Sequence, residues 1–564
     1  MVIIKENKKN MKQFYYISVI LLLMLITACS DVVKENALTA KFKFEKAVYY
    51  VGEAVTISDE TMGGSGKYTY HWDLGNETTS TESNPTVVYQ VNGAYTVTLE
   101  VRDSKGAYAM AHKVLTIDTA PLPDVGNVRL KWVAATPLGE VRSNTPAVSD
   151  DNSIYMVSND HFLRKFSAEN GSEIWSFDLW TATDGETPEG NTHTTPSIDT
   201  DGTIYIGTGD KSGKVGRVYA IHPDGTKKWV VAGNAETGFW NKGAASTPRI
   251  NYLTCAIGEK HVYMGNGGST GSVLAVDKST GYRVGYVANA DNTGGPSGGV
   301  SAGLVLTSDK TIVWTGGKNG LFGASAAALN AGGNVVWAWQ VYSSGDDKPS
   351  QNMNGSLAIG EDGTIYGVAT YPSTGSSVFA ISSDGIEKWR TSLGNVGNLD
   401  QGGIVIGLDG SIIATVKRAA GESTGGIISL NADNGSINWH YGIPEDVSGC
   451  AAIDQAGNIH FGTQSGNYYI IKPELSDAQL ILKRDVAALI SESNSAMKTD
   501  WEVGSGKIWS SPTIGPDGVI YIGVSNTNNM LKSALVALED DGITGAAISA
   551  WPMKGKDRRH TSAQ

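Results

Sequence analysis

Cysteine, charge and helical periodicity are all scarce in this 564-residue sequence. Only three cysteines occur, no two of them adjacent, and a disulfide between Cys255 and Cys450 has no support in the sequence. Each of these two is expected to be a small buried strand residue. Charged residues make up 18% of the chain and the formal net charge is −13, without a basic stripe, which argues against a nucleic-acid partner. The partners should be neutral or cationic.

The sequence also lacks the long apolar run of a membrane span. Basic residues between Lys8 and Lys12 precede an apolar run from Ile17 to Ile26, which is too short for an ordinary span, and small residues follow it up to Cys29. This pattern is typical of a secretory signal, and its cysteine resembles that of a bacterial lipobox. We therefore expect Cys29 to be lipidated, which would anchor the protein to the outer membrane of a Gram-negative-type bacterium. The alternative is an uncleaved anchor with an incidental cysteine.

What the sequence does contain is glycine, at 69 positions, between short strand-like segments. The length exceeds what one hydrophobic core supports, so several domains are expected. We expect them in the following order: signal peptide (1–28), tether (29–37), immunoglobulin-like domain (38–118), proline-stiffened linker (119–128) and repeat region (129–564). The predicted fold class is all-β.

Residues 38–118 alternate apolar and polar side chains with period two, which predicts a small immunoglobulin-like β-sandwich with Trp72 in its core. The run from Trp72 to Gly75, followed by Tyr89 and Asp103, resembles the polycystic-kidney-disease (PKD) domain. Two departures are mild: Leu74 replaces the usual Phe, and Asn76-Glu77 stands where Asp-Gly is common. Asp73 and Asp103 are expected to form turn hydrogen bonds rather than to hold a cation. The resemblance implies a spacer domain.

One pattern returns eight times after residue 129. Each unit has a strand of small residues, a tight turn such as Asp201-Gly202, a β-branched or aromatic strand and, near its end, a Trp. The units open at Thr145, Thr195, Thr247, Ala302, Ser356, Gly403, Cys450 and Ser511. Repeats of 47 to about 60 residues without helical periodicity predict propeller blades. The prediction is an eight-bladed β-propeller preceded by the PKD sandwich.

The spacing of the Trp residues resembles the tryptophan-docking repeat of the pyrroloquinoline-quinone-type β-propellers. That family includes quinoprotein dehydrogenases and non-enzymatic bacterial lipoproteins. The best match to its Ala-x-Asp-x-x-Thr-Gly pattern runs from Ala275 to Gly281, although Gly285 stands where a Trp is expected. The seventh unit delays its Trp to Trp501, and the eighth has Ala546 at the expected place. We interpret the Trp residues as packing devices whose indole N–H groups bond to carbonyls.

Two features of the repeat region stay open at this point. Either Trp132, on an extra strand before the first unit, completes the last unit and joins the two ends, or the tail from Ala550 onward covers the ring. The insertion from Pro473 to Thr499 contains a stretch from Ala478 to Ile490 that is expected to form a partly helical flap on one rim.

The residues just before each opening strand should line one mouth of a propeller's central channel. Amides, charges and aromatics occur there, as in a pocket for a polar ligand, although any loop-rich mouth is polar. The candidates are Arg142, His193, Trp240, Lys242, Asn352, Asp400, Gln401, Asp446 and Trp509, with Asn144, Ser297, Asn354, Ser448 and Lys507 beside them. His193 alone is more typical of a solvated strand edge than of catalysis.

The resemblance to quinoprotein dehydrogenases implies a quinone, a calcium ion, an Asp base and usually a disulfide between adjacent cysteines. The sequence has no such cysteine pair, and Asp400 and Asp446 belong to no recognisable ligand set. Metal-binding His spacing, a nucleophile elbow and a phosphate loop are lacking too. We therefore expect no cofactor, no metal and no catalytic residues.

The function expected from the sequence is that of a non-enzymatic, lipid-anchored binding or scaffold protein of the cell envelope. Its ligand would be an envelope protein, or a polysaccharide that stacks on Trp240 and Trp509. The alternative is a secreted enzyme on a propeller scaffold, either a quinone-dependent dehydrogenase or a polysaccharide-degrading lyase or hydrolase.

Overall fold

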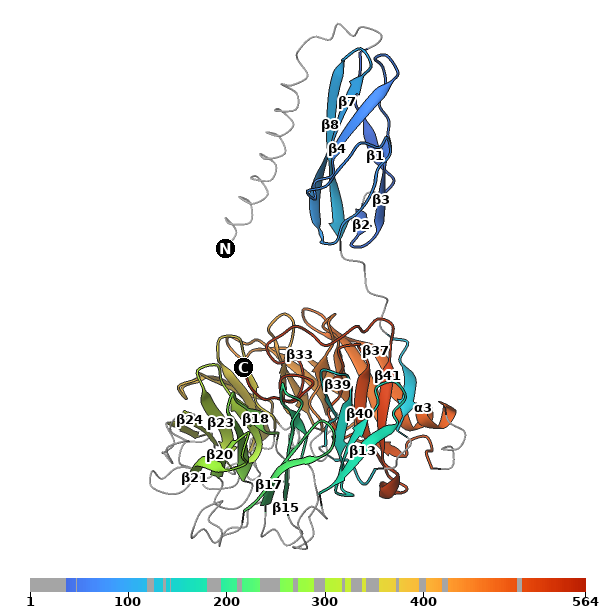
Figure 1. Cartoon of the computed structure of the whole chain (residues 1–564). Helices are drawn as coiled ribbons and strands as arrows, with labels where there is room; N and C mark the ends of the chain where they lie inside the picture. Colours follow the sequence, from blue (N-terminus) through green and yellow to red (C-terminus); the bar gives the residue numbers. More distant parts are fainter. Residues whose placement is uncertain are drawn as a thin grey trace. The chain divides into compact units, whose positions relative to one another are not determined.

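The computed structural model describes most of the chain from residue 37 onward. The described residues are 37–46, 48–118, 126–134, 138–142, 144–179, 194–209, 216–233, 254–266, 272–288, 300–316, 320–325, 337–340, 355–371, 375–394, 402–417, 425–493 and 500–564. They belong to two compact units, Met1–Leu122 and Pro123–Gln564. Both units are built from strands (Figure 1), so the expected all-β class is confirmed.

The first unit is a two-sheet sandwich. One sheet has the order β1-β3-β6 and the other β2-β8-β7-β4-β5. The strands are β1 (Phe42–Phe44), β2 (Val48–Tyr50), β3 (Ala54–Asp59), β4 (Tyr68–Asp73), β5 (Thr79–Ser80), β6 (Thr86–Val88), β7 (Gly93–Asp103) and β8 (Tyr108–Asp118). Alternate residues of β7, including Val97, Leu99 and Val101, point into the core. Trp72 is fully buried there, as predicted, and its indole N–H donates to the Glu82 carbonyl at 2.8 Å.

The two aspartates of this sandwich make turn hydrogen bonds. Asp103 accepts from the backbone N–H groups of Ser65, Lys105 and Ala107 at 2.8–2.9 Å. Asp73 accepts from the N–H of Gly75 at 2.9 Å. Both carboxylates thus order the backbone of tight turns, as the sequence predicts.

The second unit contains eight antiparallel sheets among its described residues. In seven of them, consecutive strands pair in chain order. The first four sheets are formed by β10 (Ala147–Val148), β11 (Ile154–Val157), β12 (Phe162–Phe166) and β13 (Glu173–Asp178); β14 (Ser197–Ile198), β15 (Ile204–Gly209), β16 (Gly216–Ile221) and β17 (Lys227–Gly233); β18 (Ala256–Ile257), β19 (His261–Asn266), β20 (Ser272–Asp277) and β21 (Arg283–Ala288); and β22 (Val300–Leu306), β23 (Thr311–Gly316), β24 (Gly320–Ser325) and β25 (Trp337–Gln340).

The next three sheets repeat this plan, and the last one departs from it. They are formed by β26 (Ala358–Ile359), β27 (Ile365–Tyr371), β28 (Gly375–Ile381) and β29 (Glu387–Ser392); β30 (Ile404–Ile406), β31 (Ile412–Val416), β32 (Gly425–Leu430) and β33 (Ile437–Ile443); β34 (Ala452–Ile453), β35 (Ile459–Gly462), β36 (Asn467–Pro473) and β37 (Ala478–Asp485); and β38 (Gly506–Lys507), β39 (Thr513–Ile514), β40 (Ile520–Asn526), β41 (Ala534–Glu539) and β9 (Arg129–Val133).

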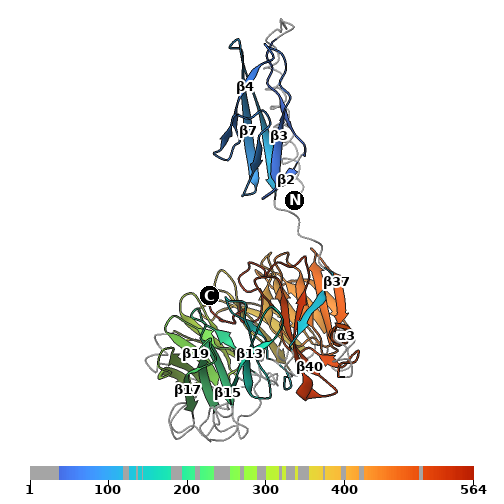
Figure 2. The ribbon, with the colours of Figure 1, turned by 45° about the vertical axis from the view of Figure 1, so that its right-hand side comes forward.

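The last sheet takes its outermost strand from the beginning of the repeat region. β9 pairs with β41, with Trp132 opposite Ala537. Figure 2 shows β9, in cyan, beside the orange-red strands of the last sheet. Trp132 therefore completes the eighth unit, whereas Ala546 lies outside this sheet and bridges Asp454. Of the two possibilities left open by the sequence, the strand of Trp132 joins the two ends of the repeat region.

The insertion in the seventh unit is less irregular than predicted. Its first half, predicted as part of a flap, is β37, the fourth strand of the sheet, and only Val486–Ser493 forms a helix, α3. Leu482 lies opposite Ile470 just before a bulge, the place that Trp residues occupy in other sheets, so the assignment of Trp501 to that place was wrong. The apolar run of β37 fits a strand and a helix equally well, which explains the error. Within the described part of the chain, no helix is long and apolar enough to cross a membrane.

Four of the eight described sheets are attached to the next by an indole ring. The indole N–H of a fourth-strand Trp donates to a carbonyl in a turn of the following sheet, at 2.7–3.0 Å. The pairs are Trp132 with Ala168, Trp175 with Pro223, Trp229 with Lys278 and Trp389 with Ala432. Within its own sheet, each of these rings packs on a second-strand Tyr, with centroids 5.8–5.9 Å apart. The predicted structural role of these Trp residues is confirmed.

A glycine in the following sheet makes room for each ring. In the case of Trp389, this is Gly435, whose φ of 70° is left-handed. A Cβ added there would lie 2.4 Å from Cε3 of the ring, closer than any real contact. Gly171, Gly225 and Gly281 face Trp132, Trp175 and Trp229 in the same way. The Thr-Gly end of the repeat motif is thus explained by the close approach of the neighbouring Trp.

We predict that Gly435→Ala destabilises the repeat region more than Gly363→Ala does. Both glycines have φ near 70–78°, but a Cβ on Gly363 would meet nothing within 4 Å. The backbone cost shared by both changes is about 1–2 kcal/mol, and the clash with Trp389 should add about 1–3 kcal/mol to the first. Urea unfolding followed by fluorescence measures the difference. Equal losses in the two variants would show that the Trp–Gly contact is unimportant.

Candidate functional site

The structure describes three of the nine predicted ligand-binding residues: Arg142, Asp446 and Trp509. The other six lie outside the described residues, namely His193, Trp240, Lys242, Asn352, Asp400 and Gln401, as does the predicted lipidation residue Cys29. Of the three, Arg142 and Trp509 contact one another. The backbone carbonyl of Asp446 accepts a hydrogen bond from the N–H of Gln464.

Arg142, Lys507 and Trp509 form a compact group, which we call the Trp509 cluster. Cζ of Arg142 lies 5.7 Å from the ring centroid of Trp509, and Nζ of Lys507 lies 5.2 Å from it. The Arg142 side chain is 47% exposed, and its Nε donates to Glu140 at 2.9 Å. Each cation lies within the range in which the negative face of an indole attracts a positive charge.

The backbone around one serine of β40 positions this cluster. Ser525 pairs with Lys507 across the sheet, and its hydroxyl also contacts the segment that carries Arg142. The Ser525 Oγ accepts from the N–H of Val141 at 2.9 Å and donates to the Val141 carbonyl at 2.5 Å. Two segments from opposite ends of the repeat region are therefore held at the same point.

Asp446 lies beside a buried polar network that the sequence did not reveal. Its neighbour Glu445 accepts hydrogen bonds at 2.6–3.0 Å from Thr463, Asn467, Tyr469 and Lys483. Burial alone would raise the pKa of Glu445, but the hydrogen bonds, first that of Lys483, outweigh burial and lower this pKa to about 2. A single Glu in a loop carries no sequence signal that distinguishes it from a solvated one. The network is structural, because its donors satisfy both carboxylate oxygens.

The C-terminal segment 549–564 lies across the ends of the innermost strands. Backbone N–H groups at the ends of six of these strands donate to its carbonyls at 2.8–2.9 Å. The pairs are Ile406 with Trp551, Ile453 with Pro552, Val148 with Arg558, Ile198 with Arg559, Ile257 with Thr561 and Leu306 with Ser562. The amide of Gln564 donates to the Gly360 carbonyl of a seventh sheet at 2.6 Å. This segment therefore covers the end of the innermost strands that lies opposite the Trp509 cluster.

Two side chains of this segment reach between the innermost strands. Lys554 is buried, and its Nζ donates to the hydroxyls of Thr145 and Thr195 at 3.3 and 3.2 Å. Burial lowers the pKa of Lys554. His560 is also buried, with its ring nitrogens 2.7 and 2.9 Å from the carbonyls of Lys554 and Pro146. The space between these strands is thus occupied by the chain itself.

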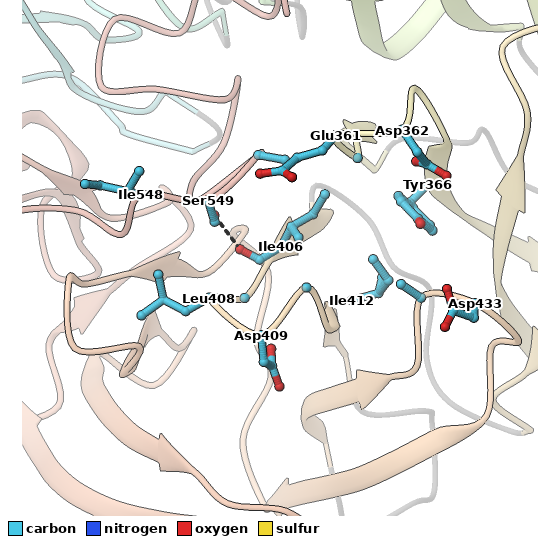
Figure 3. A pocket seen from close by; sticks show the side chains of 15 residues that line it. Glu361, Asp362, Tyr366, Ile406, Leu408, Asp409, Ile412, Asp433, Ile548 and Ser549 are labelled. Atoms are coloured by element: carbon cyan, nitrogen blue, oxygen red, sulfur yellow. Dashed lines mark hydrogen bonds between the residues drawn. The ribbon is translucent and has the colours of Figure 1, made fainter.

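An acidic pocket of about 460 Å³ lies next to this segment (Figure 3). It is lined by the turns after β26 and β30 and by Ile548–Ala550, where the Ser549 hydroxyl donates to the Ile406 carbonyl at 2.7 Å. Its carboxylates are Glu361, Asp362, Asp409 and Asp433, and its apolar side chains include Tyr366, Leu408 and Ile548. Burial would raise the pKa of Asp362, but hydrogen bonds from Thr364 and Lys388 lower it to about 2. Four carboxylates therefore line this pocket beside the C-terminal segment.

Comparisons with known proteins identify both units. Residues 45–117 match the sequence model of the PKD domain, and residues 269–525 match the model described as outer membrane protein assembly factor BamB. The chain carries a PKD domain followed by quinoprotein-type propeller repeats. Collagenase ColA of Bacillus cereus is 45% identical over 65 residues, which are 11% of this chain and 7% of the collagenase. The chain thus spans only a small part of the curated relatives it matches.

Solved structures support the assignment of the propeller repeats. The quinohemoprotein alcohol dehydrogenase ADHIIG of Pseudomonas putida HK5 has a TM-score of 0.53 at 12% identity, covering 75% of this chain and 78% of that chain. The quinohemoprotein alcohol dehydrogenase of Comamonas testosteroni has a TM-score of 0.54 at 12% identity, covering 74% and 78%. At this identity the likeness establishes the fold alone.

The described residues of the propeller repeats do not fit the quinone and calcium that the resemblance to dehydrogenases implies. Calcium requires six to eight oxygen ligands, several of them carboxylates. The described part of the chain has no group of three or more His, Cys, Asp or Glu that could hold a metal ion. Between the innermost strands, the buried Lys554 amine supplies a donor, not an oxygen ligand, to Thr145 and Thr195. Cys450 forms no disulfide, and burial raises the pKa of its thiol.

We predict that Glu445→Gln destabilises the protein at neutral pH and has less effect in acid. The folded-state pKa of Glu445 is lower than its ordinary value of 4.5, so its stabilisation is fully present above 4.5 and disappears as pH falls towards about 2. The difference in urea midpoint between this variant and the wild type should shrink over that range.

Glu474→Gln is the matched control, because Glu474 is exposed and removing its carboxylate changes the net charge equally. Its urea midpoint should equal that of the wild type at each pH. A loss in Glu445→Gln that stays constant from neutral pH down to about pH 2 would contradict the assigned role of the carboxylate network.

Proposed function

We propose that this protein is a non-enzymatic, lipid-anchored binding or scaffold protein of the cell envelope, whose eight sheets are the blades of one closed propeller. The pairing of β9 with β41 supports closure, because the strand that completes the last sheet also carries Trp132, which docks on Ala168 of the first sheet. A ring closed in this way is rigid, as a ligand platform requires.

The observation that carries this proposal is the position of the C-terminal segment 549–564. It bonds to the ends of six innermost strands and places Lys554 and His560 between them. A cofactor enzyme on this fold would need that space for the reacting groups, whereas a binding protein needs only its outer surfaces. Quinoprotein-type repeats in which the chain fills its own centre therefore favour binding over redox chemistry.

The proposed ligand site is the end of the innermost strands that lies opposite the C-terminal segment. The Trp509 cluster offers a half-buried aromatic ring and two cations there. Trp240, which lies outside the described residues, belongs to the same predicted mouth. Aromatic and cationic side chains around a concave surface suit a polysaccharide or the polar surface of another envelope protein. The lipid on Cys29 would hold the protein at the membrane, and the PKD domain would act as a spacer.

We predict that the purified mature chain binds but does not convert its ligand. Incubation with pyrroloquinoline quinone, calcium and alcohols should give neither a tightly bound chromophore nor oxidation. Polysaccharides retained on the immobilised protein should show no new reducing ends or unsaturated products. In parallel, a pull-down from native membranes should enrich a ligand above a column that carries the PKD domain alone.

Three results would overturn the proposal. Alcohol oxidation that depends on the added quinone would identify a dehydrogenase. Depolymerisation of a retained polysaccharide would identify a lyase or hydrolase. Failure of both the polysaccharide panel and the membrane pull-down to yield a specific ligand would contradict a binding role.

A further inference from the structure

We propose that the Trp509 cluster binds the anionic groups of an acidic polysaccharide, one that carries carboxylate or sulfate. This inference rests on the proposed binding function and names its ligand class. It starts from a local charge that differs from that of the whole chain. The protein carries a formal net charge of −13, yet two cations contact one indole ring at the end of the innermost strands opposite the C-terminal segment.

One indole ring contacts both cations of the cluster. Arg142 and Lys507 are each attracted to the negative face of an aromatic ring, and they lie 5.7 and 5.2 Å from the Trp509 centroid. Trp509 therefore acts as a platform that holds the cations in place, in addition to any contact that it makes with a sugar.

The cluster keeps a positive charge that its protein partners do not neutralise. Glu140 pairs with Arg142 through Nε, and 47% of the Arg142 side chain remains exposed. Lys507 forms no ion pair with any residue in the described part of the chain. Among the described residues, one carboxylate thus pairs with this group of two cations. A guanidinium and an ammonium on one indole ring suit carboxylate or sulfate, because charged donors bind these groups most strongly.

The position of the cluster favours a polymer over a small anion. The Ser525 hydrogen bonds fix Arg142 and Lys507 at the rim of the innermost strands. They do not line the acidic pocket at the other end, which holds Glu361, Asp362, Asp409 and Asp433. Partly exposed cations outside a pocket can contact a long chain of charged sugars, and this binding should decrease as salt increases.

The test compares three polymers on the full mature protein: alginate for carboxylate, dextran sulfate for sulfate, and dextran as the neutral reference. We expect the wild type to bind at least one anionic polymer at low salt, much less at high salt, and dextran not at all. The double variant Arg142→Gln/Lys507→Gln should weaken this binding about tenfold or more, because it removes two charge-assisted contacts. Which polymer binds separates carboxylate from sulfate recognition.

Two further variants make the result specific. Lys260→Gln/Lys472→Gln removes the same charge at exposed positions elsewhere and should bind like the wild type. Trp509→Phe should retain most of the binding because a ring face remains, whereas Trp509→Ala should lose as much as the double variant. Equal binding by all variants, or equal losses in both double variants, would overturn the inference.

Other outcomes separate this inference from the proposed function. If dextran binds as well as the charged polymers, the protein binds glycans but the anionic site is wrong. If no polymer binds and the membrane pull-down yields a specific protein, the inference again fails while the binding function stands. If neither assay yields a ligand, both fail.

Discussion

The repeat region depends on one contact, an indole ring of one sheet packed on a glycine of the next. The ring buries a large apolar surface, and its N–H donates to a turn carbonyl, so it contributes both apolar packing and an oriented hydrogen bond. The glycine is required because a Cβ would overlap the ring. A Tyr on the second strand supports the ring from within its own sheet. The contact recurs at four junctions and attaches neighbouring sheets to one another.

A second set of contacts acts at the inner ends of the sheets. The C-terminal segment receives backbone hydrogen bonds from the innermost strands, while the Trp residues join the outer strands. Both sets connect parts of the chain that are far apart in sequence, as does the pairing of β9 with β41. The C-terminal segment thus covers one end of the innermost strands, and the Trp509 cluster lies at the other end. That asymmetry is the basis of the proposed binding role.

The sequence predicted the features that depend on side-chain identity. Characteristic residue types mark the period-two strands, the Asp-Gly turns and the spacing of the Trp residues. They also mark the buried position of Trp72 in the PKD domain. The sequence offered a cover over the ring as one of two alternatives for the C-terminal segment, but it did not predict the hydrogen bonds of this segment to the innermost strands, because backbone hydrogen bonds carry no residue pattern. β37 was partly taken for a helix, since its apolar run fits both periods.

The candidate site was predictable only in part, for a similar reason. Arg142 and Trp509 were identified from their position before an opening strand, but their contact, and the place of Lys507 in it, depends on Ser525 joining two distant segments. The acidic pocket was missed because it combines turns of two repeats with Ile548–Ala550. Clusters assembled from several repeats are visible only once the sheets are placed next to one another.

The structure joins the two ends of the repeat region through β9 and Trp132. Hydrogen exchange of the tryptophan indole N–H groups, followed by NMR, tests this connection directly. If β9 closes the ring, the indole N–H of Trp132 should exchange as slowly as that of Trp229, which lies within the array. Exchange of Trp132 that is orders of magnitude faster than that of Trp229 would show that the ring is open and would contradict the account.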